Sequence, residues 1–222
     1  MALENFREIL SVTATITTII QFLTGVIICL GIRRKGASGD ISGFPFIAGV
    51  LGCSLWLRYG MLMRDTAMTV VNSVGLLLQL CYVFMFYLYA TNKGPYLKQV
   101  LIVFSVIFST MLYVAVEPVE DKAEFRLGLL CCATTLIFCS APLATLGDVL
   151  RTRSTETLPF YLILANVLVA AQWFLYGVAV HNLFVQVPNF ISCLIASFQL
   201  ALFAFFPSTS TRTKLQSLNS HY

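Results

Sequence analysis

Two tryptophans and two asparagines are the side chains of this sequence best suited to bind a solute. Trp56 precedes Asn72 by the same spacing that separates Trp173 from Asn189, and all four lie within long apolar stretches. An amide can donate and accept hydrogen bonds, while an indole offers an apolar face and one N–H group. Two amides and two indoles around a cavity would suit a neutral polyol, with hydrogen bonds at its rim and stacking on its apolar face.

These residues belong to an internal repeat. Residues 56–72 read WLRYGMLMRDTAMTVVN, and residues 173–189 read WFLYGVAVHNLFVQVPN. At an offset of 117 residues, Trp56, Tyr59, Gly60 and Asn72 recur as Trp173, Tyr176, Gly177 and Asn189. Self-similarity at one fixed offset predicts a duplicated architecture.

Composition places the chain in a membrane. Of its 222 residues, 58% are hydrophobic and only 11% are charged, whereas soluble domains carry about 25% charged residues. A membrane helix needs about 20 apolar residues. We expect an all-α integral membrane protein with seven spans, near residues 9–32, 43–63, 68–90, 98–117, 126–149, 159–180 and 184–206.

The seven spans divide as three, one and three. We predict a first three-helix repeat at 9–90, a linker helix at 98–117, a second three-helix repeat at 126–206 and a disordered, cytoplasmic tail at 207–222. Three crossings reverse the direction of the chain, so the extra crossing makes the two repeats parallel. Transporters place their substrate at such a repeat interface, near the bilayer midplane.

Basic residues in the short loops predict the orientation. One side carries nine of them: Arg33, Arg34, Lys35, Lys93, Lys98, Arg151, Arg153, Arg212 and Lys214. By the positive-inside rule this side is cytoplasmic, so the N-terminus lies outside and the C-terminus inside. The net charge of +4 is spread over these loops and does not indicate a nucleic-acid partner.

The sequence offers few residues for a catalytic or metal site. The two histidines lie in a short loop and in the tail, and the seven cysteines are all within apolar runs without metal-ligand spacing. We expect no enzyme activity, no metal and no cofactor. The cysteines are interpreted as packing residues, although Cys53 is kept among the candidate substrate-binding residues.

The Trp and the Asn of each pair are predicted to lie at the same depth in the membrane. Trp56 and Asn72 are each eight residues from Arg64 at an outer turn, and the second pair is equally far from His181, or about 12 Å along a helix. The alternative is that the asparagines only join helices by hydrogen bonds. Tyr59 and Tyr176, one turn nearer the outer face, would form an outer gate or anchor the interface.

Helix breakers form a second set of candidates. Pro45, Pro142, Pro159 and Gly25 lie at one depth in the predicted cytoplasmic half. Pro or Gly inside a span weakens the backbone bonds and bends the helix. We therefore predict hinges that move an inner gate, with simple packing kinks as the alternative. No acidic or basic residue lies deep in a span, which favours a facilitator over an ion-coupled carrier.

The layout, the two W-x-x-Y-G segments and the run Val187-Pro188-Asn189 resemble the SWEET sugar transporters, and among them an animal, insect-type member. The resemblance covers about residues 9–206. It implies a bundle of two three-helix units that moves mono- or disaccharides, such as glucose, by bidirectional uniport with alternating access. It also implies a homo-oligomer in the lipid bilayer of the plasma membrane, with the Golgi or another internal membrane as the alternative.

The resemblance assigns roles to single positions. The family's central asparagine pair matches Asn72 and Asn189, and its pocket tryptophan matches Trp173. A smaller residue such as Ser stands at the position of Trp56 in family members, so Trp56 would narrow the pocket towards a monosaccharide. Three of the four family prolines are present, and Gly25 replaces the fourth.

Two other protein classes are considered. A seven-helix receptor predicts no internal repeat and a longer segment for partner docking. A related PQ-loop transporter of another small solute predicts Pro-Gln pairs or an intramembrane acid, and this sequence has neither.

Overall fold

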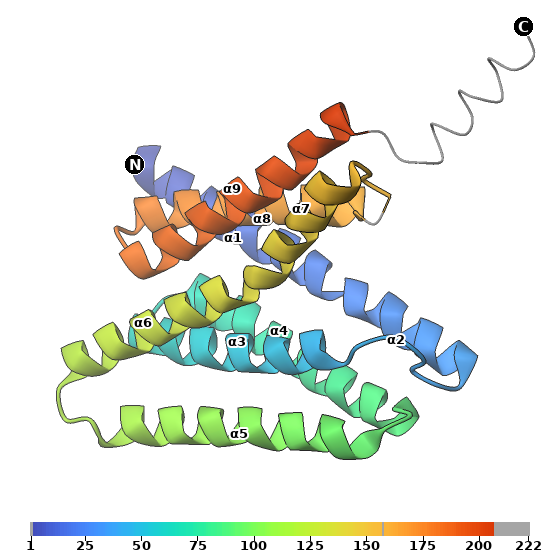
Figure 1. Ribbon diagram of the computed structural model, residues 1–222. Helices are drawn as coiled ribbons and strands as arrows, with labels where there is room; N and C mark the ends of the chain where they lie inside the picture. Colours follow the sequence, from blue (N-terminus) through green and yellow to red (C-terminus); the bar gives the residue numbers. More distant parts are fainter. Residues whose placement is uncertain (1, 157, 207–222) are drawn as a thin grey trace, which may run out of the picture. The chain divides into compact units, whose positions relative to one another are not determined.

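The computed structural model describes residues 2–156 and 158–206, and every regular element in these residues is an α-helix (Figure 1). In chain order the helices are α1 (Ala2–Phe22), α2 (Thr24–Lys35), α3 (Phe44–Leu62), α4 (Thr66–Tyr89), α5 (Lys93–Val116), α6 (Glu120–Phe138), α7 (Ser140–Thr152), α8 (Phe160–Ala179) and α9 (Leu183–Phe205). The tail at 207–222, predicted to be disordered, lies outside the described residues.

Seven stretches of the described chain are long and apolar enough to cross a membrane, which confirms the predicted spans. The first, Glu4–Lys35, combines α1 and α2, and the fifth, Glu120–Thr152, combines α6 and α7. Each of the other five is a single helix. Every stretch overlaps one predicted run, and the first and fifth extend further at both ends.

The first and fifth spans are broken at matching places. Helices α1 and α2 meet at Leu23, where the Val26 N–H donates to the Leu23 carbonyl in a tight turn (3.0 Å). Helices α6 and α7 meet at Cys139. The nearby Pro142 has no N–H, so it cannot donate to the carbonyl four residues earlier. This missing hydrogen bond explains the break at Cys139.

The helices fall into two compact units, Met1–Thr134 and the chain from Thr135 onward. In the first unit α4 contacts α1, α2, α3 and α5, and α3 also contacts α5. In the second unit α9 contacts α8 and α7. The boundary between the two units therefore lies within α6, and α5 belongs to the same unit as the first three spans. The division into repeats at 9–90 and 126–206 with a linker between them stays a prediction.

The turn between the second and third span has the same structure in both units. Arg64 and His181 both adopt a left-handed conformation, with φ of 52° and 54°. The next residues, Asp65 and Asn182, cap α4 and α9, because each side-chain oxygen accepts from the backbone N–H three residues on (2.9 Å and 3.3 Å). The offset of the sequence repeat is therefore also the offset of the backbone geometry.

The loops between the first and second spans are tied to the end of the third span in each unit. The Ser38 N–H donates to the Tyr89 carbonyl (2.9 Å), and the Thr155 hydroxyl donates to the Phe206 carbonyl (2.9 Å). Both Ser38 and Thr155 are buried. Because a buried polar group needs a partner, these bonds fix each loop against its own third helix.

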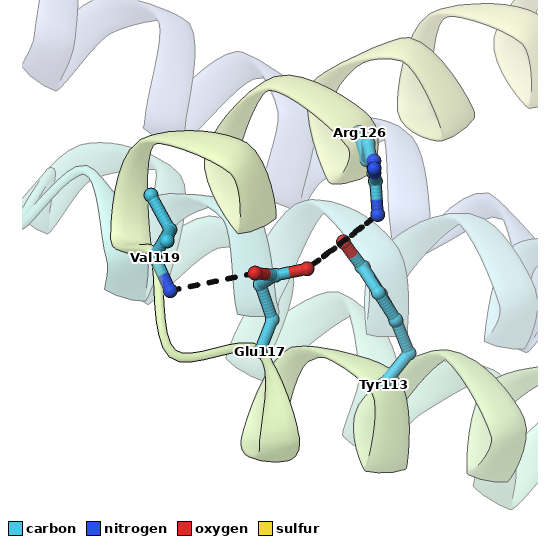
Figure 2. A network of polar contacts seen from close by, with 4 residues as sticks. All are labelled: Tyr113, Glu117, Val119 and Arg126. Carbon is cyan, nitrogen blue, oxygen red and sulfur yellow. Dashed lines mark hydrogen bonds and ion pairs between the residues drawn. The ribbon is translucent and has the colours of Figure 1, made fainter.

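A polar network joins the end of α5 to the start of α6 (Figure 2). The Tyr113 hydroxyl donates to Glu117 Oε2 (2.9 Å), and Arg126 Nη1 donates to the Tyr113 hydroxyl (2.8 Å) and lies 3.5 Å from Glu117 Oε2. The Val119 N–H donates to the other carboxylate oxygen (3.4 Å). The Tyr113 hydrogen bond is the main reason that the pKa of Glu117 lies below its usual range; the Val119 N–H and the charge of Arg126 add to it.

Candidate solute-binding site

Each unit places a tryptophan edge-on to a buried tyrosine. The ring centroids are 5.7 Å apart for Trp56 and Tyr59, and 5.5 Å apart for Trp173 and Tyr176, with the planes nearly perpendicular in both. Tyr59 and Tyr176 are only 0% and 2% exposed. Such burial argues against an anchor at the membrane surface and makes each tyrosine a support that orients its tryptophan. The outer-gate role stays a prediction.

The glycines that follow the tyrosines allow the helices to approach closely. A Cβ atom on Gly60 would lie 2.9 Å from the Met68 side chain, and one on Gly177 would lie 2.9 Å from the backbone nitrogen of Gln186. Only glycine fits where two helix backbones come this near. The repeated W-x-x-Y-G motif thus sets the contact between α3 and α4, and between α8 and α9.

The two asparagines have the same local geometry. Asn72 Nδ2 donates to the Met68 carbonyl and Asn189 Nδ2 donates to the Val185 carbonyl, both at 2.8 Å. Both side chains are partly exposed, and no other bond of either amide is found among the described residues. Each amide is therefore oriented by its own helix and keeps an oxygen and a second N–H for a further partner.

A cavity of about 280 Å³ lies within the second unit. No Asp, Glu, Lys, Arg or His is among its lining residues. Apolar residues such as Val169, Ala170 and Ile195 form much of its wall. Its polar lining consists of Thr135, Cys139, Asn166, Asn189, Ser192 and Gln199. An uncharged cavity with several hydrogen-bonding groups suits a small neutral solute.

The cavity brings together two of the predicted site residues. Asn189 and Pro142 both line it, whereas Trp173 does not and is buried one turn from the lining residue Ala170. In the first unit Trp56 and Asn72 lie on the contacting helices α3 and α4. Cys53 is buried at this contact, with its sulfur 2.9 Å from where a Cβ on Gly75 would lie. This position fits packing, and its binding role stays a prediction.

The predicted hinge residues occupy two kinds of position. Gly25 and Pro142 lie just after the breaks in the first and fifth spans. Pro45 lies in the first turn of α3 and Pro159 is the N-cap of α8, and both are exposed. The spans predicted at 43–63 and 159–180 place Pro45 and Pro159 near their starts, and the two prolines lie at the starts of α3 and α8. The hinge role of all four residues stays a prediction. Proline is favoured at helix starts because its missing N–H has no partner there anyway.

Four polar residues of the cavity were not selected from the sequence, namely Thr135, Asn166, Ser192 and Gln199, and Cys139 was interpreted as a packing residue. Thr135 recurs as Thr18 but was not singled out. Asn166, Ser192 and Gln199 have no identical residue at the matching position of the first repeat, so a search for recurring residues passes over them. Pro188 was not noted as a proline within a helix, and α9 continues through it from Leu183 to Phe205. A better signal for the polar residues is a polar side chain within an apolar run, at helical spacing from Asn189.

A helical membrane protein with a duplicated three-span unit and an uncharged, solute-sized cavity has the features of a small-solute transporter. The family described as "Sugar efflux transporter for intercellular exchange" matches residues 8–94 and again residues 125–211. The solved structure of a eukaryotic SWEET transporter aligns with a TM-score of 0.81 and 25% identity, covering 90% of this chain and 98% of that one.

Sequence relatives agree. "Sugar transporter SWEET1" of Drosophila pseudoobscura pseudoobscura is 40% identical over 205 residues, which is 91% of both chains. "Sugar transporter SWEET1" of Caenorhabditis elegans is 41% identical over 221 residues, covering 99% of this chain and 73% of the relative. The chain therefore belongs to the SWEET family of sugar transporters, which is a transporter family and not a family of enzymes.

Proposed function

We propose that the chain is a facilitative uniporter for a neutral sugar of about monosaccharide size, such as glucose. The cavity of about 280 Å³ is the observation that carries the proposal. Pockets for drug-sized ligands hold roughly 300–1,000 Å³, so this cavity suits a solute smaller than most of them. In this proposal Trp173 supports the cavity wall from one turn beyond the lining residue Ala170, and Trp56 narrows the pocket towards a monosaccharide.

The lack of charge in the cavity supports transport without ion coupling. Ion- and proton-coupled carriers keep an ionisable side chain within the membrane to carry the coupling. The lining of the cavity has only neutral amides, hydroxyls, a thiol and apolar groups. In our proposal Asn72 and Asn189 bind the sugar hydroxyls, and the gradient of the sugar alone drives transport in either direction.

Alternating access would use the broken helices. The breaks beside Gly25 and Pro142 interrupt the first and fifth spans, so the two parts of each span can change their angle without unfolding. Pro45 and Pro159 begin the next spans and fix the direction in which each loop enters its helix. Tyr59 and Tyr176, near the opposite turns, would close the outer side.

The names of the relatives support the direction and setting of this activity. A relative in Oryza sativa subsp. indica, 28% identical over 215 residues and covering 95% of this chain and 88% of the relative, is named "Bidirectional sugar transporter SWEET2a". We propose the same bidirectional transport here, by a homo-oligomer in the plasma membrane. The N-terminus would face outward, as the basic loops predict.

Uptake of labelled glucose into proteoliposomes tests the function. We expect uptake that is unchanged by an imposed proton or Na⁺ gradient, and that falls by about tenfold or more in Asn72→Ala and Asn189→Ala, because a buried sugar hydroxyl then lacks its partner. Uptake driven by either ion gradient would contradict the facilitator. Full activity in both variants would mean that the asparagines only join helices by hydrogen bonds and do not bind the sugar.

A further inference from the structure

The cavity of the second unit can be compared with the first repeat position by position. The offset of 117 residues pairs Cys139 with Phe22, Pro142 with Gly25, Ser192 with Gly75, and Gln199 with Tyr82. In these four pairs the first repeat has two aromatic residues and two glycines, and the second repeat has a proline and three polar residues. The two copies therefore differ in residue type at these four lining positions, whereas the lining residues Thr135 and Asn189 recur as Thr18 and Asn72.

In the first unit, aromatic rings occupy the space beside the two glycines. A Cβ on Gly75 would lie 2.5 Å from the Phe22 ring, and one on Gly25 would lie 2.7 Å from Cδ2 of Tyr82. The Tyr82 hydroxyl also donates to the Phe22 carbonyl at 3.1 Å. These rings fill the region between α4 and the break in the first span with apolar surface.

In the second unit, smaller polar groups take the place of the rings. The Ser192 hydroxyl oxygen lies 3.3 Å from the Cys139 sulfur, and Gln199 Nε2 donates to the Pro142 carbonyl at 3.1 Å. Gln199 is only 5% exposed, yet it lines the cavity. Buried amides in apolar surroundings cost free energy unless they have partners, so a Gln at this place needs a reason.

Both side chains are arranged to accept a hydrogen bond. The Ser192 hydroxyl donates to the Pro188 carbonyl (2.7 Å), which leaves its lone pairs to accept. Gln199 uses its N–H₂ group on Pro142, and no bond to its side-chain oxygen is found among the described residues. The Cys139 S–H can donate to one lone pair of the Ser192 oxygen, which leaves the other for a sugar hydroxyl, and a sugar hydroxyl can also donate to the Gln199 oxygen.

Asn189, Ser192 and Gln199 also share one face of α9. Ser192 is three residues beyond Asn189 and Gln199 is seven beyond Ser192, and at 3.6 residues per turn these steps keep all three on one side. At a rise of about 1.5 Å per residue, Gln199 lies roughly 10 Å further along the helix than Ser192. One monosaccharide could therefore contact Asn189 and Ser192 together, and Gln199 in a second position.

We propose that Ser192 and Gln199 bind sugar hydroxyls within the cavity of the second unit, which Asn189 also lines. This proposal rests on the proposed sugar transport and adds two residues to its site. Ser192 binds the sugar beside Asn189, and Gln199 binds it next, towards the end of α9. In the first repeat Gly75 has no side chain, and the Tyr82 hydroxyl is bonded to the Phe22 carbonyl.

The test combines side-chain deletion with hydroxyl deletion. Full-length wild type, Ser192→Ala and Gln199→Met are reconstituted, and KM is measured for glucose and for each singly deoxygenated glucose. A neutral hydrogen bond corresponds to about a three- to tenfold change in affinity. We expect each variant to raise KM for glucose by that factor, and to lose no further affinity for the one analogue that lacks the hydroxyl it binds.

Tyr82→Phe is the matched control, because it removes the polar atom at the position equivalent to Gln199. Its ratios of KM between glucose and the analogues should equal those of wild type. A variant of Ser192 or Gln199 that also keeps every wild-type ratio would overturn the proposal for that residue. For a variant that transports too slowly, the rise in Tm of the purified protein with each sugar gives the same comparison.

Failure of this proposal is distinct from failure of the proposed function. If wild type transports glucose and the variants keep its ratios, only the role of Ser192 and Gln199 is wrong. If wild type neither transports nor is stabilised by any sugar in the series, sugar transport itself is wrong, and this proposal is wrong with it.

Discussion

At the scale of single residues, Gln79 of α4 is placed where its side-chain oxygen has no partner. Gln79 Oε1 is the one buried side-chain oxygen or nitrogen without a hydrogen bond among the described residues. Its amide group fills the space beside Gly49, where a Cβ would lie 2.5 Å away. An unsatisfied buried polar group costs about 1–3 kcal/mol. We therefore predict that Gln79→Met, which keeps the volume and removes the amide, raises the Tm of the purified protein.

The same substitution at Gln199 provides the control for Gln79. Gln199 donates to the Pro142 carbonyl, so Gln199→Met loses a bond and should lower the Tm. Opposite signs at the two positions would show that pairing, and not the polarity of glutamine, sets the effect. A lower Tm for Gln79→Met would mean that Gln79 has a partner in the folded protein.

Glu117 gives a second prediction at this scale, from its lowered pKa. A carboxylate whose folded pKa lies below its ordinary value stabilises the fold above the ordinary pKa of about 4.3, and that contribution is lost as the pH falls through the lowered pKa. The Tyr113 hydroxyl is the largest cause of the shift. Tyr113→Phe should therefore raise the pKa of Glu117, so that acid destabilisation begins at a higher pH than in wild type.

Thermal unfolding across this pH range measures the effect. Glu117→Gln, which cannot ionise, should lose this part of the pH dependence. Arg126 is a weaker partner because its side chain is 58% exposed and water screens its charge. Arg126→Gln, which removes the charge, should therefore shift the acid transition less than Tyr113→Phe does. Equal shifts in the two variants would assign the lowered pKa to charge and not to the hydroxyl.

At the scale of helices, Gly25 and Tyr82 form one unit, as Pro142 and Gln199 do in the second repeat. Tyr82 of α4 donates to the Phe22 carbonyl beside the break between α1 and α2. Gln199 of α9 likewise donates to the Pro142 carbonyl beside the break between α6 and α7. Proline at position 25 would push its Cβ into the Tyr82 ring. We predict that Gly25→Pro alone reduces glucose transport by about tenfold or more and lowers the Tm, because overpacking a tight contact costs about 1–3 kcal/mol.

Repair by a second substitution distinguishes this explanation from a need for flexibility at Gly25. The double variant Gly25→Pro, Tyr82→Gln reproduces the residues of the second repeat, and it should recover most of the lost transport. Tyr82→Gln alone leaves an empty space beside Gly25 and should lower the Tm by itself. A double variant as inactive as Gly25→Pro would show that the first span needs glycine for its backbone.

The helices also show why sequence finds the spans more readily than the effect of each proline on them. Long apolar runs separated by charged turns fix the spans, because the bilayer sets their length. Whether a proline bends a helix or begins one depends on where the helix starts, and sequence places that start only to within a few residues. Pro45 and Pro159 fall within that margin and begin helices, while Pro188 lies inside α9 without being recognised.

At the scale of the whole molecule, the repeat is what makes the fold predictable. Recurring residues such as Gly60 and Gly177 recur because the same helix contact is built twice. The site is less predictable for the same reason. Part of its cavity lining differs between the two copies, so Ser192 and Gln199 escape a search for identity between repeats. Identity between the repeats marks the scaffold, the asparagines and Thr135, which recurs as Thr18, whereas Ser192 and Gln199 lie at positions where the repeats differ.

Transport by a carrier requires the whole molecule to change state, and counterflow tests this. In an alternating-access uniporter the binding site faces one side of the membrane at a time. A site that binds unlabelled glucose inside the vesicle reorients, releases this glucose outside and is then free to bind labelled glucose there. We predict that preloading proteoliposomes with unlabelled glucose makes labelled glucose accumulate transiently above its outside concentration. An open channel shows no such overshoot, because its two sides are available at once. Gln79→Met, outside the cavity lining, should keep the overshoot, whereas Asn189→Ala should abolish it.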